Sequence, residues 1–437
     1  MPWGRASEAR GLAPPLATLR CNPTRCRPHR ERVLSNLFEY HCMFAFAAAL
    51  IAAPMVIALY AYIVYPLALW TITRLRQKKP TTGGEQAWPS VTVTVPVYNA
   101  AASIRATLQR LIGLDYPRDR LQLLVLSDAS TDGTDEVVRE FSGLGVELLR
   151  AVERRGKTAL ENSAAVAARG DIIVNIDATV DVPSDSLKKL VRAFDDATVG
   201  VASGRDVSTP VNALEATGAE SGYVGYEMWL RDLETQAGSI VGASGCFFGI
   251  RRSIRDLSLP LDLSWDFASS LLARKKGYRS VSVRDAICFV PRTTRIDAEI
   301  RRKVRTMARG IRTLFYLREL MNPVRYGGFA LMLISHKLLR WVPYLLAPVS
   351  LLALGALATR SAVAQFLFVL VALGLAVGVS ALRASRWSRI APVSASTFFA
   401  AALAAGALAW WDVIRGVNTS TWEPTQRSEA RVRAASA

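Results

Sequence analysis

The sequence predicts an α/β domain with a mostly parallel sheet, flanked by transmembrane α-helices. The chain of 437 residues is 51% hydrophobic, yet its long apolar runs gather towards the two ends. Each run approaches the roughly 20 residues that cross a bilayer as a helix. Between them, short apolar strands alternate with amphipathic helices, a pattern typical of parallel α/β sheets. This amount of apolar surface excludes a disordered chain.

The segment boundaries follow from the distribution of charged and apolar residues. Residues 43–73 contain no charged side chain and predict a transmembrane helix, and residues 342–411 predict a bundle of about three more. Residues 74–299 form the expected α/β domain, and residues 300–341 form amphipathic helices at the membrane surface. Residues 412–437 are left as a tail.

Charges beside the first apolar run predict its orientation. Arg74, Arg76 and two lysines follow the run directly, and basic residues favour the cytoplasmic side. We therefore expect an integral membrane protein, in a bacterial inner membrane, with its α/β domain in the cytoplasm. Residues 1–42 would then lie outside despite their arginines, so we expect this segment to be disordered, or untranslated with Met43 as the true start. The same rule leaves the side of the C-terminal tail open.

Composition also limits the kinds of site. The formal charge is +18, but the basic residues cluster beside the membrane runs, where anionic lipid accounts for them, so a nucleic-acid binder is excluded. Only three histidines are present, at positions 29, 41 and 336, which excludes a histidine-built metal centre in the α/β domain. The five cysteines form no disulfide framework.

Two carboxylates follow predicted strands of the α/β domain. Strands are expected at 91–96, 121–126, 146–149 and 172–176, and helices at 101–114, from about 135, and at 159–169. Asp128 comes after the second strand and Asp177 after the fourth. Ligands of parallel sheets bind at the carboxyl ends of strands, so both are candidate site residues. Helix capping is the alternative for Asp128.

The segments VTVTVPVYNAAASI, LVLSDASTDGTDEVV and RRGKTALENSAAVAARGDIIVNIDA carry four ordered motifs. Together they resemble the opening of a family 2 inverting glycosyltransferase with a GT-A fold. With membrane runs on both sides, the chain resembles the membrane branch that contains cellulose, hyaluronan and poly-N-acetylglucosamine synthases. The resemblance covers residues 91–312.

This resemblance implies a nucleotide-diphospho-sugar donor. Its binding residues would be Pro96, Tyr98 and Asn99 beside the base, Asp128 on the base or ribose, Lys157 near the nucleotide, and Asp177 facing the sugar. The basic segment 301–306 stands where processive synthases carry Q-x-x-R-W. Only Arg305 matches that motif, which implies a diphosphate contact and leaves both processive and single transfer open.

The resemblance also implies a divalent metal, Mg²⁺ or Mn²⁺, bound through a D-x-D element. Asp177 fits the first carboxylate of that element, but Thr179 replaces the second. Asp181 is a possible substitute, or Asp177 serves alone. Hard oxygen ligands and a diphosphate suit either ion.

A family general base is expected some 90 residues later. Asp266 keeps that position, although Trp265 replaces the usual preceding Glu. Capping of the following helix is the alternative role of Asp266. Gly245, Cys246 and Trp265 are assigned to the acceptor side.

The predicted protein is a membrane-integrated inverting glycosyltransferase. It would move a sugar onto a polysaccharide or lipid-linked acceptor, with an Asp general base, a divalent metal on the diphosphate, and membrane lipids around its helices. The departures at Thr179 and Trp265 keep an alternative open: a catalytically impaired GT-A membrane scaffold or nucleotide sensor. Partner subunits are not identified.

Overall fold

The computed structural model describes residues 23–75, 87–209, 218–291, 296–383 and 391–421. The chain divides into two units, Met1–Ala49 and Leu50–Ala437. The described part of the first unit belongs to helix α1 (Pro23–Leu59). The α/β domain and the two sites described below lie in the second unit.

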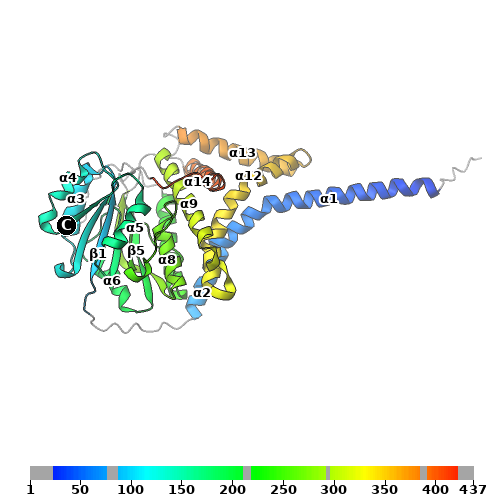
Figure 1. Ribbon diagram of the computed structural model, residues 1–437. Helices are drawn as coiled ribbons and strands as arrows, with labels where there is room; N and C mark the ends of the chain where they lie inside the picture. Colours follow the sequence, from blue (N-terminus) through cyan, green and yellow to red (C-terminus); the bar gives the residue numbers. More distant parts are fainter. Residues whose placement is uncertain (1–22, 76–86, 210–217, 292–295, 384–390, 422–437) are drawn as a thin grey trace, which may run out of the picture. The chain divides into compact units, whose positions relative to one another are not determined.

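A seven-stranded sheet forms the centre of the α/β domain (Figure 1). Its order is β3-β2-β1-β4-β6-β5-β7, and β6 runs antiparallel to both of its neighbours while the other pairs are parallel. The strands are β1 (Val91–Val97), β2 (Leu121–Ser127), β3 (Val146–Arg150), β4 (Ile172–Ile176), β5 (Val199–Thr209), β6 (Phe247–Arg251) and β7 (Arg279–Pro291). The predicted mostly parallel sheet is confirmed.

Helices cover the sheet and continue into the apolar segments. Those of the α/β domain are α3 (Ala101–Ile112), α4 (Thr134–Arg139), α5 (Lys157–Ala167), α6 (Ser186–Val191), α7 (Gly218–Ala237) and α8 (Trp265–Lys275). They are followed by α9 (Ile296–Tyr316), α10 (Pro323–Tyr326), α11 (Gly328–Leu333), α12 (Leu339–Ala358), α13 (Ala362–Arg383) and α14 (Ala391–Ile414). Two π-helical turns, η1 (Tyr60–Val64) and η7 (Ile334–Leu338), interrupt longer helices, and η1 leads into α2 (Tyr65–Leu75).

Strand β1 lies at the centre because its sequence suits burial on both faces. All seven of its residues are buried, and its valines join the main apolar core. Its buried threonines are satisfied across the sheet: Thr92 donates to Gln122 at 2.8 Å and Thr94 to Asn175 at 2.9 Å. Every buried polar group of this strand therefore has a partner, which is the condition for burying it.

Three helical segments are long and apolar enough to cross a membrane: His41–Leu75, Gly328–Ala358 and Ala362–Ser380. A shorter apolar helix, Phe399–Ile414, follows. The second segment begins at Gly328, so residues 328–341, expected as surface helices, belong to the apolar segment. The reason is that α11, η7 and α12 follow one another without a break.

The structure describes part of each end of the chain. Helix α1 begins at Pro23, inside the segment 1–42 that was expected to be disordered or untranslated, and residues 1–22 lie outside the described part. The described tail lies against the α/β domain. Arg312 donates to Thr419 at 2.9 Å and to the carbonyl of Val417 at 2.6 Å, and the carbonyl of Ser420 fills the space beside Gly156.

Candidate active site

The carboxyl ends of β1, β2 and β4 meet at one edge of the sheet. β1 pairs in parallel with both β2 and β4, and Val97 stands opposite Ser127. Polar residues follow each strand end, as the alternation of strands and helices predicts. The backbone there is held in unusual conformations, because Asn99 has a φ of 46° and Ala129 a φ of 56°. Such non-glycine residues in the left-handed region cluster at functional sites.

Asp128 fixes the loop that leads into α5. Its carboxylate is fully buried and accepts the backbone N–H of Arg155 at 2.8 Å and that of Gly156 at 2.9 Å. Gly156 has a φ of 90°, which favours glycine. In this structure Asp128 therefore acts on the loop that carries Lys157, and direct contact with a nucleotide stays a prediction.

The three residues expected beside the nucleotide base differ in position and burial. Pro96 is buried within β1. Tyr98 and Asn99 follow the strand: the guanidinium of Arg154 stacks 3.9 Å from the centre of the Tyr98 ring, and the side-chain oxygen of Asn99 accepts the N–H of Thr131 at 2.9 Å. Tyr98 is partly exposed, whereas Asn99 ties the first two strand-end loops together.

Lys157 connects two more parts of the site. Its ammonium lies 2.6 Å from the carboxylate of Asp177 and donates to the carbonyl of Gly245 at 3.2 Å. Burial acts to lower the pKa of Lys157, but the charges of Asp177, Glu161 and Asp266 outweigh it and raise the pKa. Lys157 is therefore a firmly protonated cation at the end of β4.

Asp266 lies on the other side of Gly245. A β-carbon added to Gly245 would stand 2.8 Å from Oδ2 of Asp266. The other oxygen, Oδ1, accepts the N–H of Phe267 at 2.9 Å and the hydroxyl of Ser264. The structure thus brings Asp128, Asp177 and Asp266 to one place, joined through Gly156, Lys157 and Gly245.

One residue assigned to the acceptor side is buried. Trp265 is only 1% exposed, and its indole N–H donates to Asn162 at 2.8 Å. It therefore packs in the core and anchors α8, because the helix turns position 265 inward and position 266 towards the site. Cys246 is partly exposed, and its backbone carbonyl accepts the N–H of Asp177 at 3.0 Å.

The second expected metal ligand is engaged elsewhere. The carboxylate of Asp181 lies 3.3 Å from the guanidinium of Arg110, and its backbone forms an antiparallel bridge with Phe289. Among the described residues there is no group of three His, Cys, Asp or Glu side chains that could hold a metal. A metal ligand role for Asp177, with or without Asp181, stays a prediction.

Helix α9 supplies a cation that the sequence analysis missed. Arg305 lies half-buried on this helix. One turn later, Arg309 is buried and donates to the hydroxyl of Thr158 and the carbonyl of Leu263. Burial lowers the pKa of Arg309, against the opposing charges of Asp266 and Glu161. Its four-residue spacing from Arg305 was the signal that could have identified it.

Glu161 is a second missed residue. It is 2% exposed on α5, one turn after Lys157. Burial raises the pKa of Glu161, although the charges of Lys157 and Arg255 oppose this. A buried carboxyl with a shifted pKa in the G-K-x-x-x-E-N segment, close to Lys157, Arg255 and Asp266, is typical of a functional site.

Known proteins share parts of this sequence and this fold. Residues 92–257 match the model of Glycosyl transferase family 2. The chain carries a family 2 glycosyltransferase domain. The resemblance to family 2 glycosyltransferases is thereby confirmed, while the membrane branch and the inverting mechanism stay predictions. The GT-A fold agrees with a solved mannosyltransferase from Pyrobaculum calidifontis in complex with GDP-Man and Mn²⁺. That structure is 26% identical, with a TM-score of 0.63 over 86% of this chain and 99% of the other.

Two curated relatives are similar to this glycosyltransferase domain. An N-acetylglucosaminyltransferase of Rhizobium sp. (strain N33) is 26% identical over 264 residues, 56% of this chain and 58% of the relative. A beta-monoglucosyldiacylglycerol synthase of Synechocystis sp. (strain ATCC 27184 / PCC 6803 / Kazusa) is 33% identical over 117 residues, 26% of this chain and 24% of the relative. The chain thus spans less than two thirds of the length of these relatives.

Proposed function

We propose that this protein is a membrane-integrated inverting glycosyltransferase that moves a sugar from a nucleotide-diphospho-sugar onto a polysaccharide or lipid-linked acceptor. The observation that carries the proposal is the contact series from Asp177 through Lys157 and Gly245 to Asp266. Lys157, a cation suited to a diphosphate, and Asp266, a carboxylate suited to an acceptor hydroxyl, both lie next to Gly245, which supports the proposal. Such preorganised charge is the usual source of catalysis in group transfer.

Asp266 is the proposed general base. It removes the proton of the acceptor hydroxyl, whose oxygen attacks the anomeric carbon from the face opposite the diphosphate. The new glycosidic C–O bond forms as the bond to the diphosphate breaks, and the nucleoside diphosphate leaves with its electron pair. A positioned base of this kind typically contributes about 10²–10⁴ in rate.

Lys157 and Arg305 are the proposed cations for the leaving diphosphate. Lys157 is supported by its raised pKa, which keeps it charged at the end of β4. Arg305 is supported by its position on α9, one turn from the buried Arg309. Tyr98, Asn99 and the loop held by Asp128 would flank the nucleoside.

A divalent cation fits the donor chemistry around Asp177. Magnesium sites commonly use one or two carboxylates together with substrate phosphates, and Asp177 offers a partly exposed carboxylate at a strand end. Asp181 is the second proposed ligand, once it has released Arg110. A bound Mg²⁺ or Mn²⁺ would neutralise charge on the departing diphosphate. The relative from Pyrobaculum calidifontis was solved with Mn²⁺.

The acceptor and location follow from the apolar helices. Three candidate membrane spans belong to the same chain as the site, and one relative is named a diacylglycerol glycoside synthase. We therefore propose an acceptor at the membrane surface, with the catalytic domain in the cytoplasm of a bacterium.

The test is transfer by the purified full-length protein. Detergent-solubilised protein is incubated with a panel of labelled nucleotide sugars and a membrane lipid extract, and products are sized with and without EDTA. Transfer that stops in EDTA and returns with Mg²⁺ or Mn²⁺ supports the proposal. Nucleotide binding without transfer from any donor would instead support the scaffold or sensor, and full turnover in EDTA would remove the metal.

A further inference from the structure

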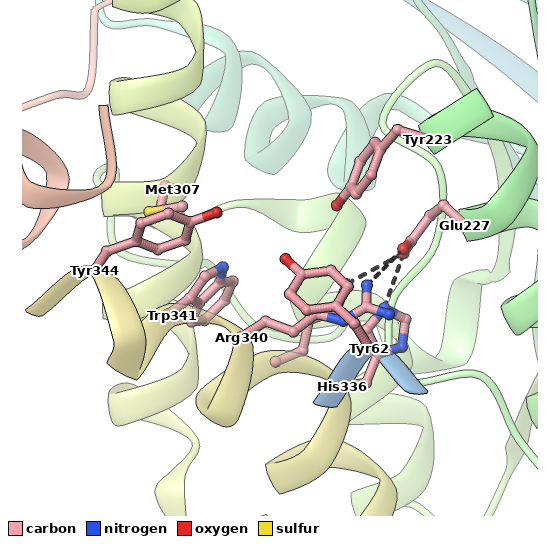
Figure 2. Close-up of a pocket in the computed structure, with 9 residues that line it drawn as sticks. Tyr62, Tyr223, Glu227, Met307, His336, Arg340, Trp341 and Tyr344 are labelled. Carbon is pink, nitrogen blue, oxygen red and sulfur yellow. Dashed lines mark hydrogen bonds and ion pairs between the residues drawn. The ribbon is translucent and has the colours of Figure 1, made fainter. Parts of the chain in front are cut away.

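A polar cavity is lined by residues of α7, α9 and the apolar helices, none of them a donor-side residue named above (Figure 2). Its volume is about 90 Å³, whereas one water needs roughly 10–15 Å³. The polar side chains around it include Tyr62, Tyr223, Glu227, Lys337, Arg340 and Tyr344. The cavity can therefore hold several waters or one compact polar group.

Both π-helical turns of the described chain contribute to this cavity. η1 carries Tyr62, and η7 carries His336 and Lys337. The hydroxyls of Tyr60 and Ser335 join the two turns at 3.0 Å. π-helical turns are rare and are frequently found at functional sites. Their presence here is a second observation, independent of the polar side chains that line the cavity.

The ionised groups around the cavity do not balance. His336 contacts Glu234 at 2.7 Å through Nδ1 and Glu227 at 2.9 Å through Nε2. Burial acts to raise the pKa of both carboxyls, but the adjacent cations outweigh it and lower the pKa of each. Both carboxylates are thus ionised, and each lies against one ring nitrogen of His336.

Three side-chain cations lie around Glu227. Arg340 donates to Glu227 at 2.9 Å, and Lys337 and Arg231 each lie 3.8 Å from it. Three side-chain cations therefore accompany two carboxylates, an excess of positive charge among these described groups, and Tyr65 donates a further hydrogen bond to Glu234 at 2.7 Å. Buried charge that is unpaired is costly.

Several guanidinium N–H donors near Glu227 have no hydrogen-bond partner in the described part of the chain. Arg340 is 5% exposed and Arg231 8% exposed. Within the described part of the chain, Nε of Arg340 and both Nε and Nη1 of Arg231 have no hydrogen-bond partner. Buried donors of this kind are normally satisfied. Of these residues Arg340 lines the cavity, together with Lys337. A phosphate group there would supply negative charge beside both and an acceptor for Nε of Arg340, and guanidinium groups match phosphate geometry.

The cavity adjoins the acceptor side of the catalytic site. Lys337 lies 5.7 Å from the ring of Phe267, the residue after Asp266, and that ring meets Trp341 edge-on at 6.0 Å. A β-carbon on Gly242 would stand 3.7 Å from the Lys337 ammonium. The Lys337 side chain, which lines the cavity, therefore also lies close to the loop of residues 242–246.

We propose that this cavity binds the phosphate of a membrane-lipid headgroup, and that a lipid seated there presents its hydroxyl past Phe267 to Asp266. The inference rests on the proposed function, because it names the acceptor class as a phosphate-bearing lipid. A lipid is favoured as the source of the phosphate because the cavity is built largely from two apolar segments, His41–Leu75 and Gly328–Ala358.

The test uses full-length protein in neutral detergent, with dodecyl phosphate, inorganic phosphate and dodecyl maltoside as probes in calorimetric titrations. Wild type should bind dodecyl phosphate more tightly than inorganic phosphate, with no matching signal from the maltoside. Lys337→Gln should weaken dodecyl phosphate binding about tenfold or more, the loss expected for one charge-assisted hydrogen bond. Arg325→Gln, an exposed cation on α10, is the matched control and should bind as wild type does.

A second measurement protects the test against misfolding. Dodecyl phosphate should raise the Tm of wild type and of Arg325→Gln, but not that of Lys337→Gln. Binding that is unchanged in Lys337→Gln, or equal for the neutral maltoside, would overturn the inference, as would tighter binding of inorganic phosphate. Binding of a nucleoside diphosphate is titrated on the same samples. If wild type binds no nucleoside diphosphate, the proposed function is contradicted. If wild type binds it but does not bind dodecyl phosphate, this inference alone is contradicted.

Discussion

Gly245 and Asp266 are so close that the first has no room for a side chain. The position that a β-carbon of Gly245 would occupy lies 2.8 Å from Oδ2 of Asp266, shorter than real β-carbon contacts. The carbonyl of the same glycine accepts a hydrogen bond from Lys157. One residue thus determines the spacing between the proposed base and the proposed donor-side cation.

Gly245→Ala should impair catalysis more than folding. The added methyl group would push the Asp266 carboxylate away from its place, and a small misplacement of a reacting group is costly in rate. We expect kcat to fall about tenfold or more, with nucleotide binding retained. Steady-state transfer assays and nucleotide titrations check this. Gly143→Ala, on an exposed turn with no neighbouring atom within 4 Å, is the control, and an equal loss of activity in both variants would contradict the prediction.

Asp266→Asn should stop transfer without unfolding the protein. Asparagine keeps the oxygen that accepts the N–H of Phe267, but it cannot accept a proton. We expect the rate to fall by about 10²–10⁴, with donor affinity near that of wild type. Product formation and donor binding are measured on the same preparation, alongside Asp256→Asn at an exposed position. Retained turnover would exclude Asp266 as the base.

Asp128→Asn should loosen the loop before α5. The new amide group would face the N–H donors of Arg155 and Gly156 instead of accepting from both. An unsatisfied buried donor costs about 1–3 kcal/mol, so we expect a lower Tm and weaker nucleotide binding. Thermal unfolding and nucleotide titration check both effects. Asp285→Asn, at an exposed position in β7, should change neither.

Arg305 and Arg309 should separate into a binding and a structural role. Arg309→Met removes the buried donor to Thr158 and Leu263, so we expect a Tm lower than that of wild type. Arg305→Met removes the proposed diphosphate contact, so we expect a higher KM for the donor at an unchanged Tm. Thermal unfolding and donor kinetics of the two variants provide the comparison, and an unchanged KM in Arg305→Met would remove its assignment.

Stability should fall in acid through Glu227 and Glu234. The pKa of each carboxyl lies below its ordinary value of 4.5, because His336 and neighbouring cations outweigh the opposing effect of burial. The unfolded chain therefore takes up protons first as the pH drops, so their contribution is complete above about 4.5 and is lost below it. We expect the Tm to fall more steeply with pH in wild type than in Glu227→Gln between about pH 5 and pH 3.5. Parallel slopes would contradict this.

The sequence by itself determined the order of elements and the edge of the sheet that carries the site. Valine and threonine alternate in β1, and an almost continuous apolar run forms β2, patterns that local propensity and burial fix without knowledge of the neighbours. The same logic placed Asp128 and Asp177 at strand ends, and the ordered motifs indicated the family.

Only the tertiary structure decided what each side chain contacts. Trp265 and Asp266 are adjacent in the sequence, yet α8 turns one into the core and the other towards Gly245. Arg309 reaches Thr158 across 151 positions, and the cavity at Lys337 joins α7 to two apolar segments. Contacts between distant residues depend on how helices pack, and periodicity along one segment carries no information about the partner it will meet.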